Sequence, residues 1–265
     1  NGGGSASSTG GGSGATGGGT AAAGGGTSGA GGGSASSGGG TGQADSGMSV
    51  VPAGPFLMGS TTGDADEKPV HEVTLSRFEI DRTEVTQAAY GACVTAGSCT
   101  APSANFDPVG RAAFPVVNVS WAQAQAFCAF LGKRLPTEAE WEKAARGPDG
   151  GTYPWGEAAP TCALATTSGC GDGGAQPVGQ LPAGQSPYGV LDLAGNVWEF
   201  TADWYADTYY SVSPLVDPQG PDAGTIKAYR GGSAGNGSSL ARSANRASTY
   251  SPAVGGSGLG FRCAR

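Results

Sequence analysis

The composition of the chain changes abruptly near residue 47, and this break constrains what each part can fold into. Residues 1–47 contain 22 glycines, most other positions there are Ser, Ala or Thr, and no proline, aromatic or large aliphatic residue precedes Met48. Such a segment cannot bury enough apolar surface to offset the entropy lost on ordering. We expect a low-complexity tail over residues 1–47 and one globular domain over residues 48–265, which is long enough for a sizeable core.

The tail also predicts self-association. Its sequence GGGSASS occurs at residues 2–8 and again at 31–37, and nearly all its side chains are small. Glycine-rich strands with small side chains can pack closely, as three-fold extended helices or as stacked sheets. We therefore predict that residues 1–47 are an assembly arm, which joins copies of the chain into a filament or another homo-oligomer.

Charge and hydropathy argue against nucleic-acid binding and against a membrane-spanning helix. The net charge is −7 and the sequence has no basic cluster, whereas binding to a nucleic-acid backbone needs Lys and Arg to displace counterions. No apolar run approaches the roughly 20 residues that a membrane-spanning helix requires. The sequence thus predicts no nucleic-acid partner and no membrane span.

The six cysteines predict a disulfide framework. Their spacing fits neither a zinc ribbon nor a C-x-x-C redox motif. Six cysteines allow 15 pairings, but Cys93 and Cys99 are close in sequence, as are Cys162 and Cys170, and pairing them locally leaves Cys128 with Cys263. Three disulfides would indicate an oxidising compartment, extracellular or at the cell surface. The alternative is six buried thiols.

Local patterns predict an α+β domain that is irregular and loop-rich. Ser120 and Thr137 each begin a helix capping box, since Gln or Glu follows three residues later. Residues 71–86 begin with the alternation of a strand, whereas after residue 148 Gly, Pro, Ser and Asp recur every few residues. The charge-rich segment 133–146 is interpreted as the solvated face of a helix.

Several longer segments identify the domain more specifically. They read VPAGPFLMGS (51–60), FPVVNVSWAQAQAFCAFLGKRLPTEAEWEKAARG (114–147), SPYGVLDLAGNVWEFTADW (186–204), YRGGS (229–233) and GLGFRCAR (258–265). In this order they resemble the formylglycine-generating enzyme, or sulfatase-modifying factor, family over residues 48–265. The resemblance implies a variant of the C-type-lectin fold. Enzymes of the family oxidise a sulfatase cysteine with O₂ and copper, while relatives serve in ergothioneine biosynthesis or only bind.

The copper-binding residues of the family are missing from this sequence. In the enzymes, two cysteines that hold copper follow the serine of the RGGS turn by three and eight residues. Counting from Ser233, these positions are Asn236 and Ala241, and an amide and a methyl group cannot replace the soft thiolates that copper(I) selects. The resemblance also implies a disulfide between Cys128 and Cys263. We therefore predict no copper, no thiol oxidation and no catalytic residue.

The segment LDLAGNVWEF is a candidate calcium site. Asp192, Glu199 and the carbonyl groups of Gly195 and Val197 can converge if the chain turns between them, and Ca²⁺ takes six to eight oxygen ligands. The same positions match the second calcium site of the family. The alternative is that Asp192 and Glu199 only accept hydrogen bonds from backbone amides in a turn. We predict a calcium ion with a structural role.

A ligand groove is predicted beside the RGGS turn. Its candidate lining residues are Arg230, Ser233, Asn236 and Trp198, and its ligand would be a glycan or a peptide. The aromatic and acidic residues between 203 and 210 are a second candidate lip for such a ligand, although Trp204, like Trp198, is expected in the core.

Three functions follow from these features. The first is a non-catalytic extracellular module that binds or assembles. The second is a calcium-dependent, lectin-like surface binding domain. The third is an enzyme of the same fold with chemistry other than copper oxidation. The absence of reactive groups at Asn236 and Ala241 favours the first.

Overall fold

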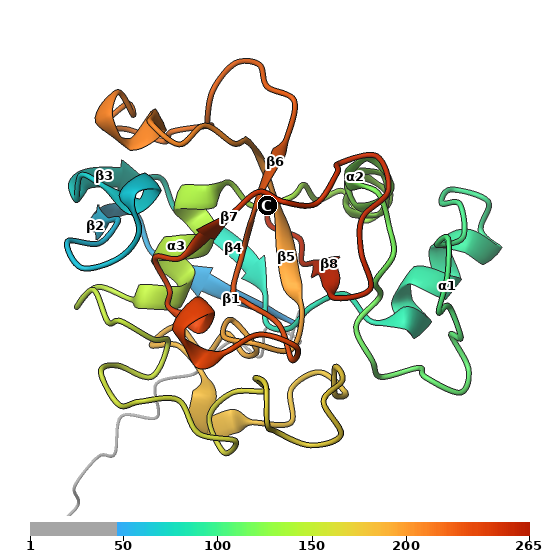
Figure 1. The fold of residues 1–265 in the computed structure, drawn as a ribbon. Helices are drawn as coiled ribbons and strands as arrows, with labels where there is room; N and C mark the ends of the chain where they lie inside the picture. Colours follow the sequence, from blue (N-terminus) through green and yellow to red (C-terminus); the bar gives the residue numbers. More distant parts are fainter. Residues whose placement is uncertain (1–46) are drawn as a thin grey trace, which may run out of the picture. The chain divides into compact units, whose positions relative to one another are not determined.

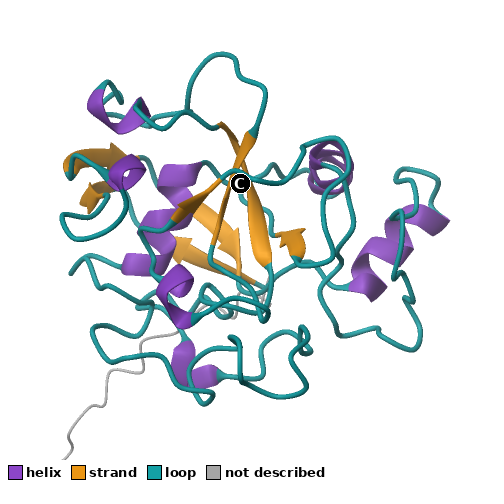
Figure 2. Cartoon of the chain, viewed as in Figure 1, coloured by secondary structure: helices purple, strands orange, loops and turns teal. Residues whose placement is uncertain are grey.

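The computed structural model describes residues 47–265, so the predicted tail and assembly arm lie outside the described part except for Gly47. Within this part the chain forms short strands, three α-helices and long connecting loops, as Figures 1 and 2 show. The predicted α+β, loop-rich class is confirmed. No helix of residues 47–265 is long and apolar enough to cross a membrane.

The first four strands form two antiparallel pairs. β1 (Met48–Val51) pairs with β4 (Phe78–Asp81), and β2 (Gly54–Met58) pairs with β3 (His71–Leu75). The alternating segment 71–86 therefore contains two strands, β3 and β4, which are separated at residues 76 and 77. The C-terminus also joins β4, because Glu79 and Arg265 exchange two backbone hydrogen bonds of 2.8 Å.

A four-stranded sheet forms the centre of the domain, in the order β7-β6-β5-β8. Its strands are β5 (Trp198–Trp204), β6 (Lys227–Arg230), β7 (Arg246–Ala247) and β8 (Leu259–Phe261). β8 runs parallel to β5, and the other neighbours are antiparallel. Along β5 the side chains alternate, so that Trp198 and Phe200 enter an apolar cluster while Glu199 points away from it to bond Trp141 and Arg262.

The helices begin where the capping boxes predict. α2 (Trp121–Phe130) starts after Ser120 and α3 (Glu138–Arg146) after Thr137, and both capping boxes are complete. α1 (Gln87–Thr95) is capped by the Thr86 side chain. In Figure 1, α1 and α2 lie on the β8 side of the sheet and α3 on the opposite side.

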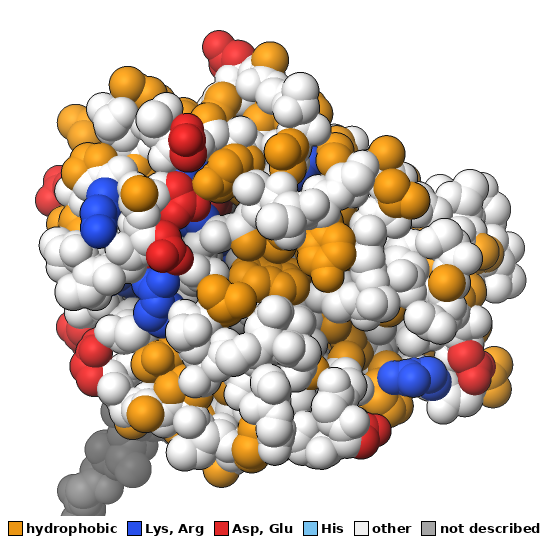
Figure 3. Space-filling view, viewed as in Figure 1, with side chains coloured by type: hydrophobic (Ala, Val, Ile, Leu, Met, Phe, Trp, Pro, Cys, Tyr) orange, Lys and Arg blue, Asp and Glu red, His pale blue; other side chains and the backbone are white. Residues whose placement is uncertain are grey.

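Two apolar clusters flank the sheet. In one, the rings of Tyr90, Phe127 and Phe261 pack from α1, α2 and β8. In the other, Trp141 of α3 packs with side chains of β1 to β4. On the face in Figure 3, apolar side chains gather near the middle, and most of the charged side chains, of both signs, lie toward the left, with a further blue and red pair at the lower right. The second cluster packs α3 against β1 to β4.

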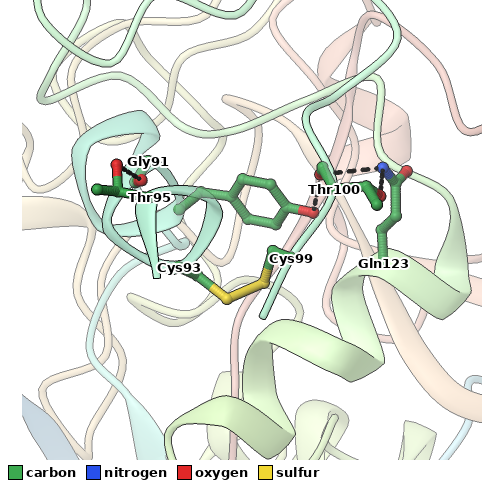
Figure 4. The surroundings of a disulfide bond; sticks show 7 residues. Gly91, Cys93, Thr95, Cys99, Thr100 and Gln123 are labelled. Atoms are coloured by element: carbon green, nitrogen blue, oxygen red, sulfur yellow. Dashed lines mark hydrogen bonds between the residues drawn. A yellow bond between two sulfur atoms is a disulfide. The ribbon is translucent and has the colours of Figure 1, made fainter. Parts of the chain in front are cut away.

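All three predicted disulfides are present, joining Cys93 to Cys99, Cys128 to Cys263, and Cys162 to Cys170. The alternative of six free thiols is wrong. Figure 4 shows the first bridge, which ties the end of α1 to the Thr100 segment, where Gln123 donates a hydrogen bond to the Thr100 hydroxyl (2.8 Å). Disulfides persist in oxidising compartments, so the three bridges support the predicted oxidising compartment.

Candidate functional site

The RGGS turn borders a depression of about 410 Å³. Gly231 and Gly232 have φ values of 98° and 76°, which residues with a side chain rarely adopt. Four segments of the chain surround the depression, and its lining residues are Gly173, Gly174, Ala175, Asn196, Ser233, Ala234, Gly235, Asn236, Tyr250, Ser257 and Gly258. Much of the wall is therefore backbone and small side chains.

The side chain of Asn236 is fixed at the edge of this depression. Its Oδ1 accepts hydrogen bonds from the Ser233 hydroxyl (2.6 Å) and from the indole Nε1 of Trp198 (2.7 Å). Its backbone carbonyl accepts from the Ser168 amide (2.8 Å). Ser233 and Asn236 line the depression as expected for a groove, while Trp198 is buried and supports Asn236 from within.

The prediction that Arg230 lines the groove is wrong. Its guanidinium is fully buried and donates to the carboxylates of Glu138 (3.1 Å) and Glu142, and to the Ser243 carbonyl (2.9 Å). The RGGS turn thus presents its serine to the depression and its arginine to the interior. Strand alternation explains this, because Arg230 ends β6 and faces α3.

Arg230 belongs to a buried group of charges between α3 and the sheet, which we call the ionic layer. Its members are Glu138, Glu142, Glu199, Asp203, Arg230, Arg246 and Arg262, all of them buried. Arg246 Nε donates to Glu138 (2.8 Å), and Arg262 donates to both oxygens of Glu199 (2.6 Å each). The prediction that segment 133–146 is a solvated helix face is therefore wrong, because Glu138 and Glu142 point inward to these arginines.

The carboxyl group of Asp203 balances the ionic layer. Burial, followed by the charge of Glu138, raises the pKa of Asp203 to about 8. Burial alone would raise the pKa of Glu138 as well, but Arg246 and Arg230 outweigh it and lower that pKa. With Asp203 protonated at neutral pH, the layer contains three carboxylates and three guanidinium groups.

The aromatic and acidic residues between 203 and 210 do not form an open lip. Asp203 and Tyr210 are buried, and Tyr210 donates to Glu142 (3.2 Å). The Lys227 ammonium lies over the rings of Trp121 and Trp204, 3.9 and 3.8 Å from their centroids, and burial lowers its pKa to about 8. These side chains hold the loops that follow β5 and are not arranged to receive a ligand.

The chain turns at the predicted calcium segment. Asp192, Gly195 and Asn196 have φ values of 58°, 83° and 57°. Asp192 Oδ2 accepts a hydrogen bond from the Gly179 amide (2.6 Å). Glu199 also accepts from the indole of Trp141 (2.8 Å), in addition to Arg262.

No three His, Cys, Asp or Glu side chains of residues 47–265 gather in a way that could hold a metal ion. A cation at this segment would therefore depend on the carbonyl oxygens of Gly195 and Val197. Both carboxylates already make the hydrogen bonds of the alternative interpretation, but a carboxylate offers about four acceptor positions. Calcium stays a prediction.

Glu84 is a member of this region that the sequence reasoning missed. It lies within electrostatic reach of Asp192, Glu199 and Arg262, and burial, followed by the charge of Asp192, raises the pKa of Glu84 well above its usual range. Its Oε1 accepts from the Asn196 amide (2.9 Å), while its buried Oε2 has no partner among residues 47–265. Three carboxyl groups thus lie near one guanidinium, and the raised pKa of Glu84 favours its neutral, protonated form. No feature of the sequence distinguishes Glu84 from the other glutamates of the alternating segment 71–86.

The architecture defines a disulfide-bonded α+β domain with a glycine-lined depression and a buried ionic layer. The profile described as "Sulfatase-modifying factor enzyme 1-like domain" matches residues 38–265. The formylglycine-generating enzyme of Streptomyces coelicolor is 37% identical, over 81% of this chain and 87% of that protein. The hercynine oxygenase of Mycolicibacterium thermoresistibile is 35% identical, over 68% of this chain and 50% of that protein.

A solved structure of PvdO from Pseudomonas aeruginosa aligns with a TM-score of 0.71 and 30% identity, covering 82% of this chain and 93% of PvdO. The profile match and the identity to the Streptomyces coelicolor protein are enough to assign the family. The chain belongs to the sulfatase-modifying factor family, as its sequence motifs predict.

Proposed function

We propose that this chain is a non-catalytic extracellular binding module that receives a peptide in the depression beside Asn236. The observation that carries the proposal is that all six cysteines are disulfide-bonded, so that the RGGS loop has no thiol beside it. At the positions where the family resemblance places the copper ligands, Asn236 is held by two hydrogen bonds and Ala241 is a buried methyl group.

The chemistry of Asn236 favours a peptide ligand. The Trp198 indole can only donate a hydrogen bond, so the Asn236 atom that faces it must be the carbonyl oxygen. The two N–H groups of the amide are thereby left for a ligand, and a peptide carbonyl is a matching acceptor. The glycines of the wall allow another backbone to approach closely.

The binding test is selection of peptides from a displayed random library on the full chain, followed by calorimetry of the selected peptides. We expect Asn236→Ala to weaken their binding about tenfold, the loss of one or two hydrogen bonds. Ser239→Ala changes an exposed residue of the same loop and is the matched control. Failure to select any peptide, or equal binding by Asn236→Ala, would contradict the proposal.

The names of the relatives favour an enzyme as the second candidate. This alternative requires turnover, whereas the binding module requires none. A peptide with a sulfatase-type cysteine, incubated with this chain, copper(I) and O₂, is expected to remain unchanged by mass spectrometry. Conversion of the cysteine to formylglycine, with this chain as the only catalyst, would refute the non-catalytic assignment.

Calcium at Asp192, Gly195, Val197 and Glu199 is proposed as a structural ion. The turn at Asp192, Gly195 and Asn196 and the unpartnered Oε2 of Glu84 support a cation in this region. Calcium at about 100 times its Kd would add about 2.7 kcal/mol to the free energy of unfolding, because it binds only the folded state. In a domain of this size we expect the Tm to fall by several degrees when EDTA is added.

Asp192→Asn separates calcium from a general effect of the chelator. Asn tolerates the left-handed backbone at this position but removes the charge. The variant should therefore fold and lose the response to EDTA. An unchanged melting curve of the native chain in EDTA would contradict the site. Glycan binding that EDTA abolishes would instead favour the lectin-like alternative.

Assembly through residues 1–47 is proposed from their composition alone. Light scattering should find a homo-oligomer for the full chain and a folded monomer after deletion of residues 1–46. Equal assembly of both chains, or a monomeric full chain, would exclude the assembly arm.

A further inference from the structure

A second hollow, of about 510 Å³, shares no lining residue with the Asn236 depression. Its volume lies within the range of about 300–1,000 Å³ that small-molecule sites occupy. Its lining includes the half-buried ring of Trp155, the exposed side chains of Asp149 and Gln185, and part of Arg146. One aromatic ring with a few polar groups around it is the composition of a ligand site.

The local structure holds Trp155 in place before any ligand binds. Pro154 and Trp155 form the tip of a tight turn, which two backbone hydrogen bonds of 2.9 Å between Tyr153 and Gly156 close. The indole Nε1 donates to the Ala158 carbonyl (2.9 Å). An aromatic side chain that is already ordered loses little entropy when a ligand stacks on it.

One part of the indole surface remains available to a ligand. The Tyr153 ring stacks on Trp155 with an interplanar angle of 2° and a centroid distance of 5.3 Å, and Tyr153 does not line the hollow. Gly156 does line it, with a φ of 112°, and a Cβ there would meet nothing within 4 Å. Trp155 also packs against a cluster of buried alanines, Ala165, Ala194 and Ala241. The hollow therefore has a ring that Tyr153 and this cluster hold in place, with bare backbone next to the part that lines the hollow.

The charges around the hollow select against an anionic ligand. Arg146 uses its terminal nitrogens internally, on the carbonyls of Leu57 (3.0 Å) and Gly150 (2.9 Å) and on Glu142 (3.0 Å). Asp149 would repel an anion, and Glu142 already balances the charge of Arg146. A ligand that is neutral and rich in hydroxyl groups avoids the repulsion by Asp149.

The remaining polar groups match hydroxyl groups. Within residues 47–265, the Asp149 carboxylate and the Gln185 side-chain amide make no hydrogen bond or ion pair, so both are available. A carboxylate only accepts hydrogen bonds, while an amide both donates and accepts, and adjacent sugar hydroxyls can satisfy the two together. We infer that this hollow binds a neutral sugar ring, with its C–H face on Trp155 and its hydroxyls on Asp149 and Gln185.

The test is a titration of the full chain, labelled with ¹⁵N at tryptophan, with the methyl glycosides of glucose, galactose, mannose and N-acetylglucosamine. We expect at least one sugar to shift the indole signal of Trp155, assigned with Trp155→Phe, and to do so in EDTA as well. Asp149→Ala and Gln185→Ala should each weaken this binding about tenfold. Asp222→Ala, another exposed aspartate, should leave it unchanged.

These exposed substitutions should not affect folding, so a loss of binding reports on the hollow itself. The inference is overturned if no sugar of the panel shifts the Trp155 signal at millimolar concentration, if both alanine variants bind as the native chain does, or if binding disappears in EDTA. A shift of the Trp155 signal by choline and by none of the sugars would also overturn it, because the site would then be cationic. None of these outcomes depends on the Asn236 depression, so this test and the peptide test fail independently.

Discussion

Removal of the Cys128–Cys263 disulfide should destabilise the domain much more than removal of Cys93–Cys99. The two bridges join residues separated by 135 and 6 positions in the sequence. In the chain-entropy account of disulfides, a loop of the first length is worth about 5 kcal/mol and one of the second about 2 kcal/mol. We therefore expect Cys128→Ala/Cys263→Ala to lose about 3 kcal/mol more of the free energy of unfolding than Cys93→Ala/Cys99→Ala.

The two double variants are a matched pair. All four cysteines are buried in the same apolar cluster, with exposed fractions of 0, 0, 0 and 8% for Cys93, Cys128, Cys263 and Cys99. Each variant removes two sulfur atoms from that cluster, so the loss of packing is similar. Loop length is the main difference between them.

Urea denaturation followed by tryptophan fluorescence measures the comparison. The unfolding midpoint should be lower for the variant without the long bridge, and its slope against urea should be steeper because its unfolded chain is less constrained. Equal losses of stability in the two variants would refute the loop-length reasoning. A free thiol at Cys128 or Cys263 in the unreduced protein would refute the pairing itself.

Three further predictions concern the interior. Arg230→Met should cost about 3–5 kcal/mol of unfolding free energy in urea, because it removes one of the two guanidinium partners of each of the buried carboxylates Glu138 and Glu142. The pKa of Asp203 is about 8 in the folded chain, against an ordinary value of 3.8, so between these pH values the folded chain keeps a proton that the unfolded chain releases. The contribution of Asp203 to the free energy of unfolding therefore falls as the pH rises from about 4 to about 8. Asp203→Asn should lack that pH dependence in urea titrations. Gly195→Ala should lower the free energy of unfolding by about 1–3 kcal/mol, because the added Cβ would lie 2.2 Å from the Thr166 carbonyl oxygen. Gly132→Ala, where an added Cβ would meet open space, should lower the melting temperature less.

Local features of the sequence determined much of the framework. The capping boxes at Ser120 and Thr137 require only residues three positions apart, and both helices begin there. The short disulfides likewise join cysteines that are near each other in the chain, and pairing them left the long bridge as the remaining pair. Interactions between residues that are near each other in the sequence can be predicted without knowing the fold.

Long-range contacts determined which charged residues are buried. Glu138 and Glu142 have the sequence pattern of a solvated helix, and Arg230 that of a groove residue, yet they meet in the interior across 92 and 88 positions of the chain. Taking these groups out of water is favourable only when their partners are already placed opposite them. The local sequence around each residue contains no information about that partner, and so only the tertiary structure decided that these charges hold α3 against the sheet.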